Sequence, residues 1–174
     1  MIAVLLSTYN GENYIAEQID SLLSQTFKDT RIFIRDDNST DRTGLIIDEY
    51  VSKYPNKIKR VDKDGNNLGC GQSFMRLLEN TQADYYMYCD QDDYWLPEKV
   101  EISYNKIKQI ESENNADDKP VVVFSDAIIV DENLSVLYDS LWESNNRNPE
   151  YAKSFYKCAV YRQAALGCTM IFNL

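Results

Sequence analysis

Residues 85–97 read YYMYCDQDDYWLP, and the fold is most readily inferred from this stretch. Its first half is aromatic and apolar, as in a buried strand, and it ends abruptly in Asp90, Asp92 and Asp93. Pro97 then marks the start of a helix, because proline is favoured in the first helical turn. The stretch therefore predicts a strand, an acidic loop and a helix in immediate succession.

The three aspartates of this loop lie within four residues of one another. Carboxylates crowded in this way repel one another, which costs stability unless a cation lies among them. Mg²⁺ and Mn²⁺ accept oxygen ligands, and such an ion is typically held by one or two carboxylates and by substrate phosphates. The loop therefore predicts a metal-bridged site for a nucleoside diphosphate. A solvated acidic turn that caps the following helix is the alternative.

Strand-like apolar runs alternate with segments of helical periodicity along the chain. We expect strands at residues 2–7, 31–35, 57–61, 84–89, 120–130 and 167–172, and a short one near 136–138. We expect helices at residues 14–23, 45–54, 72–80 and 96–110, a polar loop at 111–119 and a helical segment at 150–163. This order is typical of an α/β fold, a mostly parallel twisted sheet with helices on both faces.

Three polar clusters follow strands of this predicted sheet. STYN at residues 7–10 follows the first strand, DDNS at 36–39 the second, and DQDD at 90–93 the fourth. Ligands of open α/β sheets bind beyond the carboxyl ends of the strands, so we expect the three clusters to line one crevice. Simpler interpretations stay open, because the first cluster could be an ordinary Asn-Gly turn and the second could cap the next helix.

Composition narrows the class of ligand. The chain has 174 residues, 44% of them hydrophobic, with a formal net charge of −10 and no histidine. The length fits one domain, and the negative charge argues against nucleic-acid polymers and against an electrostatic grip on an anionic membrane. No apolar run approaches the roughly 18 residues that span a bilayer, so we expect no transmembrane segment and no signal peptide.

Several conspicuous side chains have structural interpretations. The cysteines form no CxxC pair, which argues against structural zinc, so we expect free buried thiols in a reducing cytosol at Cys70, Cys89, Cys158 and Cys168. Ser-His-Asp and Cys-His chemistry is excluded because the base is missing. We expect Trp95 and the neighbouring tyrosines to pack in the core, Asp36 to be a structural partner, and Arg35, Arg76 and the lysines to be surface charges.

The loops and their order resemble family-2 glycosyltransferases of the GT-A fold. The matching segments are STYNG at 7–11, SQTF at 24–27, RDDNSTDRT at 35–43, NLG at 67–69 and CDQDDYWLP at 89–97. VVVFSDAIIV at 121–130 and GCTM at 167–170 continue the match. The CDQDD-x-W-x-P form resembles bacterial rhamnosyltransferase-like enzymes of surface-polysaccharide synthesis within that family.

The resemblance implies a nucleotide-binding role for the first two clusters. Ser7, Thr8 and Tyr9 would hold the base and the ribose, with Asp90 near the ribose as well. Asp37 would accept the imide N–H of uracil or thymine, because an ionised carboxylate only accepts hydrogen bonds.

The resemblance also implies a metal and a sugar site. Asp92 would be the main ligand of Mn²⁺ or Mg²⁺ and Asp90 a second one, and the ion would neutralise the departing nucleoside diphosphate as a Lewis acid. Asp93 would support the site next to the sugar, and Asn67 and Gly69 would lie near the sugar too.

The implied function is an inverting glycosyltransferase of cell-surface polysaccharide synthesis. It would transfer a sugar from a dTDP- or UDP-linked donor to a saccharide or lipid-linked saccharide acceptor. A carboxylate base would deprotonate the acceptor hydroxyl, which attacks the anomeric carbon from the opposite face. We expect the protein in the cytoplasm, with the inner face of the cell membrane as the place where it meets a lipid-linked acceptor.

Family members usually continue for ~100 or more residues past the matching final strand. The base, usually an aspartate, lies in that portion, so we expect it beyond Leu174. Residues 1–174 are then expected to be the donor-binding portion of a GT-A domain, truncated at the C-terminus. A non-catalytic nucleotide-sugar-binding fragment stays open as the alternative. A phosphatase or nucleotidyltransferase is disfavoured, because neither a DxDxT loop after the first strand nor a Gly-Ser nucleotidyl motif is present.

Overall fold

The structure, a computed structural model, describes residues 1–61, 65–114, 119–148, 150 and 165–174. Its strands are β1 (Ile2–Thr8), β2 (Thr30–Asp36), β3 (Ile58–Arg60), β4 (Tyr85–Cys89), β5 (Val122–Phe124), β6 (Ile129–Val130), β7 (Val136–Tyr138) and β8 (Met170–Phe172). Its helices are α1 (Ile15–Leu23), α2 (Thr43–Lys53), α3 (Cys70–Glu79), α4 (Lys99–Asn114) and α5 (Leu141–Ser144), with a 3₁₀ turn at Gly167–Thr169.

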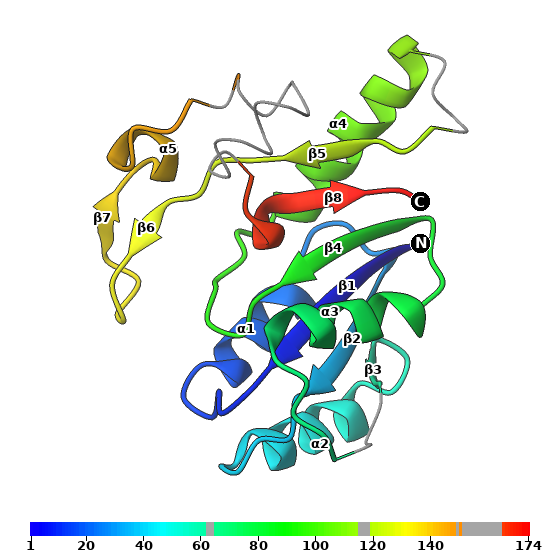
Figure 1. Cartoon of the computed structure of the whole chain (residues 1–174), viewed down its shortest axis with the longest axis vertical. Helices are drawn as coiled ribbons and strands as arrows, with labels where there is room; N and C mark the ends of the chain where they lie inside the picture. The colour runs from blue at the N-terminus through cyan, green and yellow to red at the C-terminus, as the bar shows by residue number, and fades with distance from the viewer. Residues whose placement is uncertain (62–64, 115–118, 149, 151–164) are drawn as a thin grey trace.

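The main sheet has the strand order β3-β2-β1-β4-β8-β5 (Figure 1). β3, β2, β1 and β4 run parallel, β8 is antiparallel to β4, and β5 is antiparallel to β8. The predicted mostly parallel sheet is therefore confirmed. β1 lies between two parallel neighbours and is covered on both faces, which explains why its sequence is a continuous apolar run rather than an alternating one.

Helices cover both faces of the sheet, as the sequence predicts. Successive side chains of a strand point to opposite faces, so β1 supplies two cores. Val4 and Leu6 belong to the core beneath α1, α2 and α4, in which Ile107 is fully buried. Leu5 belongs to the other core with Leu77 of α3, the helix that crosses in front of the sheet in Figure 1.

The second half of the chain departs from the predicted elements. The apolar run at 120–130 predicts one strand, but β5 ends at Phe124 and β6 pairs with β7 in a separate two-stranded sheet. Asp126 breaks the run, because its carboxylate accepts the N–H groups of Ala127 (2.8 Å) and Trp142 (3.1 Å) and the Ser140 hydroxyl (2.5 Å). The single strand is therefore wrong, because contacts with residues far along the chain hold Asp126 out of the sheet.

Two further boundaries differ. α4 begins at Lys99 rather than at residue 96, and it continues to Asn114 through part of the predicted polar loop. The end of the chain has a 3₁₀ turn before the short strand β8 instead of a strand from residue 167. The helical segment predicted at 150–163 lies outside the described residues, apart from Glu150. Within the part of the chain that the structure describes, no helix is both long and apolar enough to cross a membrane.

Glu111, predicted in the polar loop, is instead a buried residue of α4 that is 3% exposed. Its carboxylate accepts hydrogen bonds from the Tyr85 hydroxyl (2.8 Å), Lys108 Nζ (2.8 Å) and Asn173 Nδ2 (3.0 Å). Burial alone would raise the pKa of Glu111, but Lys108 and Tyr85 outweigh it and hold the pKa below its ordinary value. The carboxylate thereby joins α4 to β4 and to the residue after β8.

We predict that Glu111→Ala lowers the free energy of unfolding by about 1–3 kcal/mol, because buried donors lose their acceptor. Urea unfolding measures the loss. Glu113→Ala, on the exposed side of the same helix, should change it by less than about 0.5 kcal/mol. Since folding lowers the pKa of Glu111, the loss is largest above the carboxyl's unfolded pKa and disappears as the pH falls through its folded pKa. Equal losses in the two variants would contradict the assignment.

Candidate functional site

The three loops that the sequence singles out meet at the carboxyl ends of β1, β2 and β4. The N–H of Asp37 donates to the carbonyl oxygen of Thr8 at 2.8 Å, which joins the second loop to the first. The N–H of Tyr9 donates to Gln91 Oε1 at 2.8 Å, which joins the first loop to the acidic loop. The predicted convergence of the three clusters is therefore confirmed.

Gln91 links the first loop to the acidic one. Its Oε1 accepts the Thr8 hydroxyl at 2.6 Å as well as the N–H of Tyr9. A Cβ added at Gly11 would lie 2.5 Å from the same oxygen, so a larger residue there would displace the Gln91 side chain from this position. Sequence reasoning missed Gln91, because an uncharged amide between aspartates carries no signal until the partner loop is in place.

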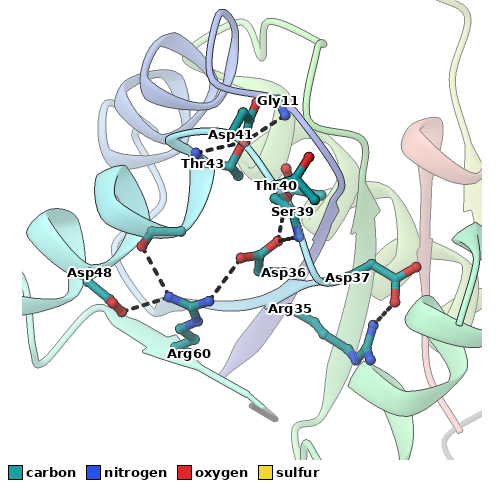
Figure 2. A network of polar contacts seen from close by, with 12 residues as sticks. Gly11, Arg35, Asp36, Asp37, Ser39, Thr40, Asp41, Thr43, Asp48 and Arg60 are labelled. Carbon is teal, nitrogen blue, oxygen red and sulfur yellow. Dashed lines mark hydrogen bonds and ion pairs between the residues drawn. The ribbon is translucent and has the colours of Figure 1, made fainter. Parts of the chain in front are cut away.

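Figure 2 shows how the loop after β2 is held. Asp36 accepts the hydroxyl of Ser39 at 2.6 Å and pairs with Arg60 at 2.9 Å, so its predicted structural role is confirmed. Asp41 accepts the N–H of Thr43, the first residue of α2, at 3.0 Å and the Thr43 hydroxyl at 2.5 Å. The carboxylates of Asp36 and Asp41 therefore form hydrogen bonds that stabilise the loop, whereas Asp37 points the other way, toward Arg35 (Figure 2).

Asp37 is the buried carboxylate of this loop, at 3% exposure. It forms an ion pair with Arg35 and accepts the N–H groups of Leu68 (2.8 Å) and Gly69 (2.7 Å). Arg35 is itself only 1% exposed and also donates to Ser73 Oγ at 3.1 Å. The prediction that Arg35 is a surface charge is therefore wrong, because a buried carboxylate needs a compensating cation.

The charge state of Asp37 follows from these contacts. Burial alone would raise its pKa, but the hydrogen bonds from Leu68, Arg35 and Gly69 outweigh burial and hold the pKa below its ordinary value. Asp37 is therefore an ionised acceptor at neutral pH. Its Oδ2 accepts one hydrogen bond among the described residues, from Gly69, and a carboxylate oxygen has room for a second.

The loop before α3 is hydrogen-bonded to the loop after β2. Gly69 has a φ of 79°, which favours glycine, and this conformation turns its N–H toward Asp37. Asn67 is exposed two residues earlier. The Ser7 hydroxyl donates to Ser73 Oγ at 2.6 Å and so joins the end of β1 to α3. Gly69 thus contacts Asp37 directly, and Ser7 is linked to it through Ser73 and Arg35. Asn67 immediately precedes Leu68, whose N–H also donates to Asp37.

The acidic loop forms a second cluster. Three potential ligand atoms lie within 4.8 Å of one another, one each from Asp90, Asp93 and Cys168. All three residues are partly buried. Asp92 is exposed. The sequence predicted Asp92 and Asp90 as metal ligands, whereas the atoms that the structure brings together belong to Asp90 and Asp93. The thiol of Cys168, on the 3₁₀ turn before β8, was not predicted as a site residue.

Burial is the first cause of the unusual electrostatics of this cluster. It raises the pKa of Asp90, helped by Asp92, and raises the pKa of Asp93, helped by Asp90. Lys99, the first residue of α4, lies among the same groups, and its burial lowers its pKa. Its Nζ donates to the carbonyl oxygen of Cys168 at 2.7 Å, so the prediction that the lysines are surface charges is wrong here.

The residues present fit a divalent cation. Asp93 Oδ2 is buried and accepts no hydrogen bond among the described residues. Leaving a carboxylate oxygen unsatisfied and holding it beside a second carboxylate both cost free energy. An ion bound by Asp90 and Asp93 would remove both costs, and carboxylates are the ligands that Mg²⁺ and Mn²⁺ prefer.

The packing predictions hold in part. Trp95 is 1% exposed and is a core residue, as predicted, with Lys99 Nζ 3.9 Å from the centre of its ring. The three described cysteines are free thiols, but only Cys89 is buried. Cys70 is exposed at the start of α3, and Cys168 is partly buried, so the expectation of uniformly buried thiols is wrong.

The comparisons with known proteins agree on one family. The model of glycosyl transferase family 2 matches residues 3–166 of this chain. An uncharacterised glycosyltransferase of Rickettsia typhi is 32% identical over 138 residues, which cover 79% of this chain and 40% of the relative. The dTDP-rhamnosyl transferase RfbG of Shigella flexneri is 39% identical over 98 residues, which cover 55% of this chain and 34% of that protein.

A solved structure supports the same fold. S. aureus TarS 1–349 in complex with UDP-GlcNAc aligns with a TM-score of 0.54 at 27% identity, over 71% of this chain and 33% of that one. The chain thus spans less than half the length of each of these proteins. The α/β architecture described above is the GT-A fold that the sequence predicted.

We predict that Arg35→Met lowers the free energy of unfolding by about 3–5 kcal/mol, because it leaves the Asp37 carboxylate buried without its cation. Urea unfolding measures the change. Arg76→Met, at a pair with Glu79 that is exposed on both sides, is the control and should cost less than about 0.5 kcal/mol. Adding Asp37→Asn to Arg35→Met should recover part of the loss, and a double variant no more stable than the single one would contradict this account.

Proposed function

The chain belongs to glycosyl transferase family 2, and from this premise we propose that it binds the donor of a sugar-transfer reaction. The donor is a nucleoside-diphosphate sugar with a uracil or thymine base, held in the crevice at the carboxyl ends of β1, β2 and β4. One observation carries the proposal. An ionised carboxylate with a spare acceptor position, Asp37, and a cluster fitted to a divalent cation, Asp90 with Asp93, lie on two loops that are both hydrogen-bonded to the loop after β1.

In our proposal, Asp37 selects the base. The imide N–H of uracil or thymine would donate to Oδ2, where one hydrogen bond is already accepted from Gly69. Cytosine presents an acceptor at the equivalent ring nitrogen, so an ionised carboxylate would repel it. Tyr9, with 47% of its surface exposed, supplies a ring that can pack against the base, and Ser7 and Thr8 shape the wall beneath it.

The acidic loop would hold the diphosphate through Mn²⁺ or Mg²⁺. Asp90 and Asp93 are the carboxylates that the structure brings together, and Asp92 at the exposed rim completes the oxygen ligands. The bound ion would act as a Lewis acid on the departing nucleoside diphosphate. Asn67, Gly69 and Asp93 would lie nearest to the sugar.

The chemistry of the whole protein is proposed more broadly. Because one relative is a dTDP-rhamnosyl transferase and one structural neighbour was solved with UDP-GlcNAc, these two sugar nucleotides are the first donors to test. We propose inverting transfer to a saccharide or lipid-linked saccharide acceptor in cell-surface polysaccharide synthesis, on the cytoplasmic side of the membrane. Residues 1–174 would provide the donor-binding portion, and the base would come from elsewhere in the protein. Binding without transfer when an acceptor is supplied is the result expected of a non-catalytic fragment.

We predict that UDP or dTDP binds in the presence of Mn²⁺ and that EDTA abolishes this binding, as measured by calorimetric titration. Asp92→Ala should abolish this metal-dependent binding, because the ion then loses an oxygen ligand. Glu49→Ala, an exposed carboxylate on α2, is the matched control and should leave the affinity unchanged. An unaltered affinity in Asp92→Ala would count strongly against the proposed function.

We also predict that Asp37→Asn reduces the preference for UDP over CDP by about 10- to 100-fold, the equivalent of one hydrogen bond to a charged group. Asparagine keeps the shape of the side chain but replaces an acceptor oxygen by a donor. Asp36→Asn is the control, because that carboxyl contacts Ser39 and Arg60 instead. Urea unfolding confirms that both variants are folded, and a preference that persists in folded Asp37→Asn would refute this assignment.

A further inference from the structure

We propose that Cys168 supplies a thiolate ligand to the cation held by Asp90 and Asp93. The mixed oxygen and sulfur site would then take Zn²⁺, Co²⁺ or Cd²⁺ more tightly than Mg²⁺. This inference rests on the proposed function, because it concerns the same cation, and it deepens that function by naming a further ligand and the class of metal.

Geometry is the first support. The three ligand atoms lie within 4.8 Å of one another. Ligand atoms that share one zinc ion lie about 2.0–2.3 Å from it, so two of them can be separated by up to roughly 4.6 Å. A small side-chain rotation therefore suffices to place the thiol and the two carboxylates around one ion.

The backbone holds the thiol in this position. Cys168 lies on the 3₁₀ turn that leads into β8, and β8 pairs with β4, the strand that precedes the acidic loop. The turn is closed by Thr169, whose hydroxyl donates to the carbonyl oxygen of Leu166 at 2.9 Å. Lys99 Nζ donates to the Cys168 carbonyl at 2.7 Å, which fixes the peptide but leaves the thiol turned toward the aspartates.

The unsatisfied oxygen of Asp93 is a second, independent support. Asp93 Oδ2 is buried without a hydrogen-bond partner among the described residues, although Lys99 lies nearby. A cation at this position would satisfy the oxygen that the lysine does not reach. A thiol binds a metal ion as the thiolate, so the proton of Cys168 would pass to solvent as the ion binds.

The donor set decides the class of metal. Mg²⁺ takes oxygen ligands and gains little from a thiolate, whereas Zn²⁺, Co²⁺ and Cd²⁺ bind sulfur well. Sequence analysis could not have found this ligand, because Cys168 lies 75 residues from Asp93 and no metal-binding spacing connects them.

Titration of the full chain with Co²⁺ tests the inference, because thiolate-to-cobalt charge transfer absorbs in the near ultraviolet and is independent of activity. We expect the band in the wild-type protein and in the control variants Cys70→Ser and Cys158→Ser, and its loss in Cys168→Ser. Cys168→Ser should weaken Cd²⁺ binding by at least about tenfold and Mg²⁺ binding by less than about threefold.

Each outcome is decisive. Co²⁺ binding without the band in wild-type protein would overturn the thiolate ligand, whether or not Cys168→Ser folds, and so would a band that persists in Cys168→Ser. Wild-type protein that binds none of these ions would show that Lys99 already neutralises the cluster, which also overturns the inference. Metal-dependent UDP or dTDP binding, measured on the same samples, separates the two proposals: if it persists without the band, only the thiolate ligand fails.

Discussion

The buried ion pair between Arg35 and Asp37 is the contact on which the rest of the candidate site depends. Removing two charges from water costs several kcal/mol per ion, and this cost is recovered only when every remaining donor and acceptor is satisfied. Much of this cost is offset because Asp37 accepts the N–H groups of Leu68 and Gly69 and Arg35 donates to the Ser73 hydroxyl on α3. The backbone N–H of Asp37 also donates to the Thr8 carbonyl oxygen at the end of β1. The pair therefore fixes the loops after β1 and β2 and the start of α3 relative to one another. Buried ion pairs are often no more stabilising than apolar side chains of similar volume, so the proposed role of Asp37 in base recognition offers a reason for the charge.

Much of the fold could be predicted from sequence because β1, β2 and β4 are apolar runs whose polar loops must gather at one edge of a parallel sheet. The elements that could not be predicted depend on contacts between distant residues. Asp126 keeps the chain after β5 out of the sheet because its carboxylate accepts hydrogen bonds from Ser140 and Trp142. The sequence of the apolar run gives no indication of these distant partners. Likewise, the burial of Arg35 follows only from the position of its acidic partner, since arginine is otherwise a surface residue.

The pKa values of the two acidic sites are shifted in opposite directions. The pKa of Asp37 is lowered, because arginine and two backbone N–H groups more than offset its burial. The pKa values of Asp90 and Asp93 are raised, because burial and mutual repulsion exceed the help from Lys99. A carboxylate that the protein has already neutralised can read a neutral base by one hydrogen bond. Carboxylates that it has left under-compensated are where an external cation gains most, which is consistent with the proposed division of the base and the diphosphate between the two sites.

Gln91 joins the acidic loop to the loop after β1, and that loop in turn accepts the N–H of Asp37 at the Thr8 carbonyl oxygen. The Gln91 side chain accepts the Thr8 hydroxyl and the Tyr9 N–H, while its backbone lies between Asp90 and Asp92. The same peptide segment thus sets the first loop, which would contact the base, and the acidic loop, which would contact the phosphates. Because an amide makes this link, it adds no charge to a loop that already has three carboxylates. The separation between the proposed base site and the proposed phosphate site is then set by the folded chain rather than by the ligand, as the proposed binding of a nucleoside diphosphate requires.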